Sequence, residues 1–159
     1  MDPTRSEAAV VETFYAAFAR RDGEAMAAAY APDASFRDPA FGTLRGPEVG
    51  AMWRMLTADA RDLVVSARGV EGAAGRARAD WTAEYTFSAT GRHVVNHVHA
   101  EMRIAGGLIE DHVDEFSFWA WSRQALGPPA YAIGWNPLGP ALIRRRARAR
   151  LAAAMARDT

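Results

Sequence analysis

The stretch RARADWTAEYTFS, residues 76–88, decides the fold because its apolar and polar residues alternate without interruption. A period of two over this length is typical of a β-strand with one face against a core. The apolar face would hold Ala77, Ala79, Trp81, Ala83, Tyr85 and Phe87, and the polar face Arg78, Asp80, Thr82, Glu84 and Thr86. The sequence therefore predicts a sheet that is buried on one side.

Three further long strands are predicted around this one. They span Leu63 to Val70, Arg92 to Ile104 and Leu108 to about Trp119, with Gly106-Gly107 as a hairpin turn. In the strand from Arg92 the inward residues would be Val94, Asn96, Val98, Ala100, Met102 and Ile104, with His93, His97, His99, Glu101 and Arg103 outward. Strands joined by short turns in this way form an antiparallel meander.

Helical patterns precede the meander. Ser6 can cap a helix that runs to about Arg21, and its apolar stripe is Val10, Phe14, Ala17 and Phe18. A short helix from Glu24 to Tyr30, a short strand from Ala34 to Arg37 and a helix from Gly46-Pro47 through Leu56 follow. Helices followed by a meander predict an α+β fold, in which one face of a curved antiparallel sheet packs on the helices.

Composition narrows the class of protein. The chain has 159 residues, of which 50% are hydrophobic and 24% charged, as expected for one globular domain. Its formal net charge is zero and no apolar run approaches the ~20 residues of a membrane span, so we expect no nucleic-acid or membrane partner. The absence of cysteine, the acidic and polar N-terminus and the preference for Arg over Lys fit a bacterial, cytoplasmic protein without disulfides.

The C-terminal part differs from the rest. We place the main domain at residues 1–127 and an extension at 128–159, which packs on or extends from the same domain. GPPAYAIGWNPLGP predicts a packed loop, and ALIRRRARARLAAAMARDT a basic helix. Ile143, Ala147 and Leu151 repeat every four residues, which favours a helix docked on its own domain with a solvated basic face. The alternative is that Arg144 to Arg150 contact an anionic partner.

The segment YAPDASFRDPAFG, residues 30–42, carries the first candidate for chemistry. Asp38 ends a short apolar strand just before a proline, so its carboxylate would lie beside a core. Burial disfavours the charged form and can raise the pKa of Asp38 into the working range of a general base. The alternative is that Asp38 caps a turn, since Asp-Pro commonly begins one.

The order of elements resembles the nuclear transport factor 2-like superfamily, which includes ketosteroid isomerases, SnoaL-type polyketide cyclases and limonene epoxide hydrolases. The most specific segments are FYAAFARRDGEAMAAAYAPDASFRDP, YTFSATGRHVVNHVHAEMRIAGGLIEDHVDEF and WSRQALG. The resemblance covers roughly residues 10–127. It implies a cone, in which a bent sheet wraps around helices and leaves an apolar cavity. It also implies that Asp38 matches the general base of the isomerases.

The two oxyanion donors of the isomerases have no counterpart in this chain. By resemblance, Phe14 stands where the isomerases have a tyrosine, and Ala100 where they have a protonated aspartate. Tyr15 lies next to Phe14 but points about 100° away around the helix. Asn96, on the inward face, could replace a donor or could be a satisfied core amide.

The last strand places two polar residues on its inward face. His112 and Asp114 alternate with outward residues, and their Cα atoms should be about 6.5–7 Å apart. We read this spacing as two groups that flank one ligand without bonding directly; the alternative is an inverted strand with both in solvent. Asp114 also aligns with an aspartate of the epoxide hydrolases. Arg78-x-Asp80 resembles their remaining pair but lies on the opposite face, and Ser117 replaces a second acid common in relatives.

Other chemistries have weaker support. His97-x-His99 could chelate a metal, but these histidines read as an outward, solvated or dimer-forming face. The sequence contains no phosphate-binding glycine loop, dinucleotide fingerprint or serine nucleophile elbow. We therefore expect no metal and no cofactor.

These observations predict a protein that binds a small apolar molecule in the cone and forms a homodimer through the outer face of the sheet. If it is an enzyme, acid–base chemistry would use Asp38 as the base, with Asp114 and His112. The ligand-binding residues would be Tyr15, Met52, Trp53, Trp81, Tyr85, Asn96, Val98 and Phe116. Two alternatives stay open: a non-catalytic binding or dimerisation module, and a hydrolase or cyclase that uses Asp114.

Overall fold

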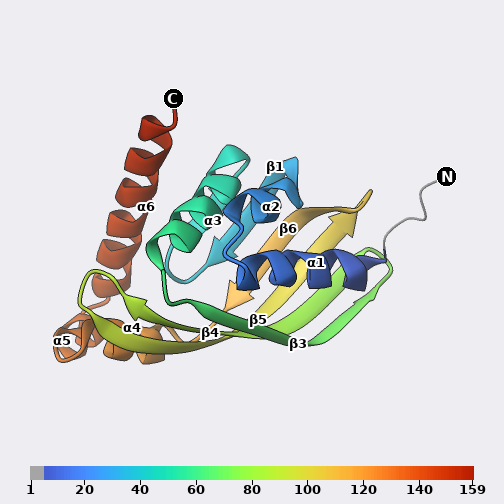
Figure 1. The fold of residues 1–159 in the computed structure, drawn as a ribbon. Coiled ribbons are helices and arrows are strands. Elements are labelled where there is room, and N and C mark those ends of the chain that lie inside the picture. The colour runs from blue at the N-terminus through green and yellow to red at the C-terminus, as the bar shows by residue number, and fades with distance from the viewer. Residues whose placement is uncertain (1–5) are drawn as a thin grey trace.

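The fold is an α+β arrangement of helices against one curved sheet, seen in a computed structural model that describes residues 6–159, the side chains of residues 134 and 135 excepted. The helices are α1 (Glu7–Ala19), α2 (Gly23–Ala28), α3 (Pro47–Asp59), α4 (Phe118–Leu126), α5 (Pro129–Trp135) and α6 (Gly139–Arg157). The strands are β1 (Tyr30–Asp38), β2 (Gly42–Arg45), β3 (Val64–Ala73), β4 (Arg76–Phe87), β5 (Arg92–Ala105) and β6 (Leu108–Glu115). Figure 1 shows α1, α2 and α3 on the same side of the sheet, with α6 beside α3.

The sheet is mixed, with the strand order β2-β1-β6-β5-β4-β3. The predicted meander from β3 to β6 is antiparallel throughout, but β1 pairs with β6 in parallel. The fully antiparallel sheet predicted from sequence is wrong at this one pairing. Its physical reason is that β1 and β6 are separated by α3 and the whole meander, so no hairpin fixes their relative direction.

The alternation in β4 is confirmed. Ala77, Ala79, Trp81 and Ala83 are buried, while the residues between them are exposed or half-buried. The ladder to β5 places Trp81 opposite Val98 and Ala83 opposite Asn96. The inner face of the sheet therefore carries the side chains that the sequence placed there.

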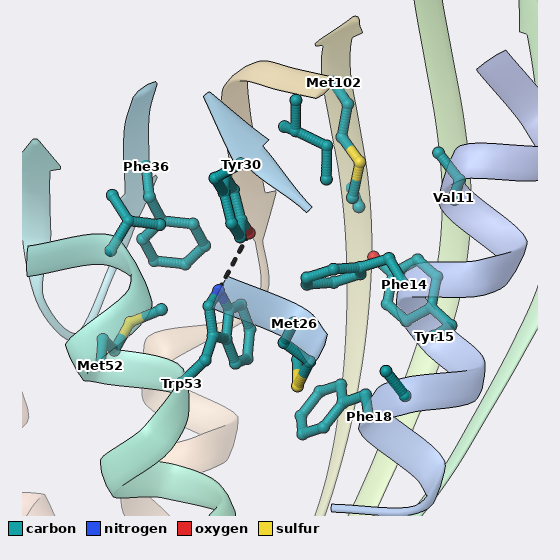
Figure 2. Close-up of a cluster of buried hydrophobic side chains, with 14 of the residues drawn as sticks. Val11, Phe14, Tyr15, Phe18, Met26, Tyr30, Phe36, Met52, Trp53 and Met102 are labelled. Atoms are coloured by element: carbon teal, nitrogen blue, oxygen red, sulfur yellow. Dashed lines mark hydrogen bonds between the residues drawn. The ribbon is translucent and has the colours of Figure 1, made fainter. Parts of the chain in front are cut away.

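The core lies between this inner face and the N-terminal helices. Ser6 caps α1 as predicted, since its Oγ accepts a hydrogen bond from Ala9 N at 3.2 Å. The apolar stripes of α1 and α3 meet at an aromatic cluster, in which the rings of Phe14 and Phe18 lie edge-on to Trp53 at centroid distances of 5.6 and 5.0 Å. Figure 2 shows these rings with Met26, Met52 and Tyr30 around them. Such edge-to-face contacts add to the stability from buried apolar area.

Several boundaries differ from those predicted. Strand β6 ends at Glu115 rather than near Trp119, because Ser117 Oγ accepts a hydrogen bond from Ala120 N at 3.1 Å and caps α4. The predicted alternation therefore does not reach Phe116 and Phe118. Strand β1 begins at Tyr30, which the sequence placed at the end of a helix, and β2 was not predicted.

The C-terminal segment is more helical than predicted. Part of the expected loop forms α5, and α6 packs against α3. Leu151 is buried, and Ala147, Ala154 and Met155 pack against the main core. No helix within residues 6–159 is both long and apolar enough to cross a membrane.

Candidate functional site

Two carboxylates lie side by side on β1 and β6. The parallel ladder pairs Phe36 with His112 and ends with Arg37 opposite Val113; Asp38 and Asp114 follow these last partners directly, and the charge of Asp114 acts on Asp38. Neighbouring strands are about 4.8 Å apart, and residues at matched positions point to the same face. The sheet therefore sets Asp38 next to Asp114 on the face that holds the core.

Asp38 has both properties that the sequence offered as alternatives. Its Oδ1 accepts a hydrogen bond from Phe41 N at 2.6 Å, which is the geometry of a turn cap. Burial nevertheless raises the pKa of Asp38 to about 7, with the bond from Phe41 lowering it, the charge of Asp114 raising it and His112 lowering it. The carboxyl is therefore built into a turn and is poised to exchange a proton near neutral pH.

His112 and Asp114 form a direct hydrogen bond, which the sequence analysis had judged too long. His112 Nε2 lies 2.8 Å from Asp114 Oδ1. The prediction was wrong because it used the Cα separation alone, whereas side chains in a strand can lean along its direction and close the gap. Both side chains are buried, at 0% and 3% exposure, so the alternative of an inverted strand is excluded.

The pair continues into a buried hydrogen-bonded chain. Tyr30 OH lies 2.7 Å from His112 Nδ1, and Trp53 Nε1 donates to Tyr30 OH at 2.9 Å, as the dashed line in Figure 2 marks. On the other side, Trp81 Nε1 donates to Asp114 Oδ1 at 3.3 Å. With a neutral imidazole, the pattern assigns the proton to His112 Nε2, because Tyr30 donates to Nδ1. A buried carboxylate requires such donors, and Asp114 has two.

Tyr30 is the member of this buried hydrogen-bonded chain that the sequence did not reveal. It stands at the head of the stretch that contains Asp38, but it was assigned to a helix. An irregularity in the β1–β6 ladder between Tyr30 and Ser35 breaks the alternation that would have revealed its inward side chain. Its position at the start of that stretch was the only signal available in the sequence.

Tyr15 contributes an unused hydroxyl to the same region. Its OH is buried and has no hydrogen-bond partner among the described residues. Burial raises the pKa of Tyr15 well above its ordinary value, and the charge of Asp114 raises it further. The ring lies 6.1 Å from that of Trp81, which itself bonds to Asp114. Tyr15 is thus a free hydrogen-bond donor beside the buried polar chain.

The remaining predicted ligand-binding residues lie in two places. Met52 and Val98 are in the main core with Trp53 and Trp81. Tyr85 and Phe116 are half-buried between the main core and a second cluster around Val94 and Trp121, and Tyr85 OH accepts a hydrogen bond from Trp121 Nε1 at 2.9 Å. Asn96 is half-buried on β5. The structure brings together Asp38, His112, Asp114, Trp53, Trp81 and Tyr15, and it leaves Tyr85, Phe116 and Asn96 farther along the sheet.

Two hollows of the molecule lie away from Asp38, His112 and Asp114. One of about 540 Å³ is lined by Arg92, His93, Ala120, Arg123 and Gln124. Another of about 590 Å³ lies between α2, α3 and α6. Neither is lined by Asp38, His112 or Asp114.

The outer face of the sheet carries paired charges. His99 lies between Asp80 and Glu101, at 2.8 and 3.0 Å, and these carboxylates raise the pKa of His99. Arg78 bonds to Glu71. Arg78 and Asp80 thus lie on the opposite side of the sheet from Asp114, as expected. Within residues 6–159, no group of three or more His, Asp or Glu side chains is placed to hold a metal ion.

Comparison with known families matches residues 11–112 to the SnoaL-like domain, which is well over half of the chain. The chain belongs to the SnoaL-like domain family. This match confirms the superfamily predicted from sequence, and it covers every element from α1 to most of β6. Helix α6 lies outside the matched range. No curated protein matches the sequence significantly.

Solved structures share the fold of this SnoaL-like protein. A hypothetical protein with a ketosteroid isomerase-like fold from Catenulispora acidiphila DSM 44928, in complex with trimethylamine, has a TM-score of 0.67 at 20% identity and covers 80% of this chain and 97% of its own. An LEH-like epoxide hydrolase from M. tuberculosis gives 0.62 at 18% identity, over 79% and 93%. TerC, co-crystallised with polyporic acid, gives 0.62 at 18% identity, over 74% and 95%. Similarity at these identities shows a common cone fold.

Proposed function

We propose that this SnoaL-like protein is an acid–base enzyme that transfers a proton on a small, largely apolar molecule, with Asp38 as the group that takes and returns the proton. The observation that carries the proposal is the placement of Asp38 beside Asp114. Two carboxylates in different surroundings can divide the roles of proton carrier and fixed charge. Asp114 is held by His112 and Trp81, while Asp38 Oδ1 is bound only by backbone.

The reaction class that suits this arrangement is proton abstraction beside a carbonyl group. The ionised Asp38 removes a proton from the carbon beside the carbonyl, the C–H electron pair forms a C=C bond, and the C=O π pair moves to oxygen. The protonated Asp38 then returns the proton to a carbon of the enolate, which can be a different carbon where a neighbouring double bond is conjugated with it. A buried donor stabilises the negative oxygen in such a step. The free hydroxyl of Tyr15 is the donor we assign to this role, in place of the side chains lost at Phe14 and Ala100.

The apolar character of the substrate follows from the walls of the cone. Met52, Trp53, Trp81 and Val98 are aromatic or aliphatic side chains of the main core, and Phe116 packs against that core, so a ligand that enters it would meet mostly apolar groups. Two proteins of the same fold were solved with small molecules, one with trimethylamine and one with polyporic acid. These complexes support a small molecule as the ligand of this chain.

A non-catalytic module is the second candidate, and one observation favours it. The interior is filled by its own aromatic rings, and the two hollows described above lie away from Asp38. In that case the protein would act through its surface, for example as a homodimer through the outer face of the sheet. A hydrolase or cyclase that uses Asp114 has less support, because Arg78 and Asp80 lie on the outer face.

Isotope exchange tests the proposal. The protein is incubated in D₂O with small cyclic enolisable ketones, and loss of the C–H signal beside the carbonyl is followed by proton NMR. We expect exchange above the buffer rate, and we expect Asp38→Asn to abolish it while Asp33→Asn, an exposed carboxylate on the same strand, leaves it intact. Ketone binding without exchange, or exchange that survives Asp38→Asn, would exclude Asp38 as the base.

A further inference from the structure

Helix α6 lies outside the matched family domain and yet contacts the turn that carries Asp38. Arg148 Nη1 donates to Thr43 O at 2.8 Å and to Phe41 O at 3.3 Å. Phe41 is the residue whose N–H bonds to Asp38 Oδ1 at 2.6 Å. A continuous path of hydrogen bonds therefore runs from the C-terminal helix through one turn residue to the candidate base.

Arg144, one turn earlier on α6, covers the same turn. Gly42 pairs with Asp38 across the β1–β2 ladder and has a φ of +72°. A Cβ built on Gly42 would lie 2.9 Å from Arg144 Cδ, so the arginine stem occupies the space of the missing side chain. The turn is thus covered by α6 as well as bonded to it.

The docking of α6 does not depend on Arg148 alone. Leu151 is 3% exposed against the main core, and Arg150 forms an ion pair with Asp59 of α3. The other charges around the turn are Glu48 of α3, at 4.0 Å from Arg148 Nη2, and His112 and Asp114 of β6. Loss of Arg148 should therefore loosen the turn while α6 stays in place.

We propose that Arg148 is a positioning residue for Asp38, and that α6 is a part of the candidate site that this chain adds to the family domain. A guanidinium presents several N–H groups in a rigid plane, so Arg148 can hold the carbonyls of Phe41 and Thr43 together. That contact fixes the turn and keeps the N–H of Phe41 aimed at the carboxylate. That Arg148 affects catalysis through Asp38 rests on the proposed function. That Arg148 holds the turn does not.

Four variants test the inference. Arg148→Ala removes the contact, and Arg148→Lys keeps the charge without the planar fork. Arg150→Ala weakens docking without touching the turn, and Arg145→Ala removes an exposed arginine of the same helix. For each variant, amide hydrogen exchange of Phe41 and Thr43 and the titration of the Asp38 carboxyl carbon are measured by NMR, together with the melting temperature.

We expect Arg148→Ala to speed exchange at Phe41 by roughly tenfold, the effect of losing about one hydrogen bond that involves a charged group. The loosened turn also weakens the bond from Phe41 N that lowers the pKa of Asp38, so this pKa should rise from about 7. Arg148→Lys should change both quantities less. Arg150→Ala and Arg145→Ala should leave both the exchange rate of Phe41 and the pKa of Asp38 unchanged. Unchanged exchange in Arg148→Ala, or an equal change in Arg150→Ala, would overturn the inference.

The two proposals fail in different ways. If Asp38 of the unaltered protein titrates near its ordinary value, the proposed acid–base function fails. The exchange rate of Phe41 in Arg148→Ala against Arg150→Ala still decides whether Arg148 holds the turn.

Discussion

Asp38 and Asp114 directly follow Arg37 and Val113, the last paired residues of the parallel β1–β6 ladder, although they are 76 positions apart in the chain. Like charges at this separation disfavour ionisation of both groups. His112 and Trp81 donate hydrogen bonds to Asp114, whereas Asp38 has no side-chain donor and burial raises its pKa to about 7. The two side chains are chemically the same, so the difference between them comes from their surroundings: His112 and Trp81 bond to Asp114 and not to Asp38.

The stability of the protein should depend on pH through Asp38. Its pKa is about 7 in the folded state and 3.8 in the reference state, so between these values the folded protein binds the extra proton. This contribution of Asp38 to the free energy of unfolding is fully present below about pH 4 and is lost as the pH rises through 7, by up to about 4 kcal/mol at about 1.4 kcal/mol per pKa unit. Urea unfolding between pH 4 and 8 measures this loss.

The matched variant for this experiment is Asp38→Asn. An asparagine oxygen can still accept the hydrogen bond from Phe41 N but carries no charge. The fall in the free energy of unfolding between pH 4 and 7 that comes from Asp38 should therefore be absent in Asp38→Asn. Relative to Asp38→Asn, Asp38→Ala should cost about 1 kcal/mol more at every pH, because it also removes the turn cap. A pH profile of Asp38→Asn parallel to that of the unaltered protein would show that the carboxyl titrates normally.

Removal of the Tyr30 hydroxyl should destabilise the fold. Tyr30→Phe leaves His112 Nδ1 and Trp53 Nε1 without their buried partner, at an expected cost of about 1–3 kcal/mol. Chemical unfolding measures the loss, and ¹⁵N NMR of His112 reports whether its proton leaves Nε2. Tyr131→Phe is the control, since Tyr131 is 55% exposed. Equal stability of the two variants would mean that the buried chain contributes nothing.

The His112–Asp114 pair should behave as one unit. His112→Leu leaves a buried carboxylate with a single donor, Trp81, and should cost about 3–5 kcal/mol. His112→Leu combined with Asp114→Leu removes both polar groups, so the double variant should be more stable than the sum of the single losses predicts. Additive losses in this double-mutant cycle would argue against a direct interaction.

Gly42 should tolerate substitution less than another glycine of similar backbone geometry. Gly42 and Gly91 have φ of +72° and +70°, but a Cβ on Gly91 would meet nothing within 4 Å. Both Ala variants carry the backbone penalty of about 1–2 kcal/mol, and only Gly42→Ala should also displace Arg144. The difference in melting temperature isolates the contact with α6. The difference in melting temperature between Gly42→Ala and Gly91→Ala should shrink when Arg144→Ala is added to Gly42→Ala. A difference that persists would mean that the extra loss does not come from the contact with Arg144.

Local patterns predicted much of the fold. The alternation of β4 and β5 and the stripes of α1 and α3 place their side chains as expected, because each pattern is set by contacts within one element or one hairpin. The parallel pairing of β1 with β6 could not be predicted in this way. It is a contact between distant segments, and no turn between them leaves a signature in the sequence.

The sequence predicted the main residues of the candidate site but not the hydrogen bonds that join them. Asp38, His112 and Asp114 were named from their positions in strands, but the bond between the last two depends on side-chain direction, which Cα spacing does not give. Tyr30 was hidden by an irregular step in β1, and Arg148 belongs to a helix that was read only as docked and solvated. Each of these contacts joins elements that a periodic pattern treats separately.

The parallel pairing of β1 and β6 also sets the order in which this chemistry can arise during synthesis. While the chain is being made, Asp38 leaves the ribosome long before Asp114 and meets only water, so it behaves as an ordinary acidic side chain. The altered carboxyl can appear only once the last strand has been added to the sheet and the C-terminal helix has closed on the hairpin. The pKa of Asp38 therefore stays ordinary until β6 and α6 have folded against its turn.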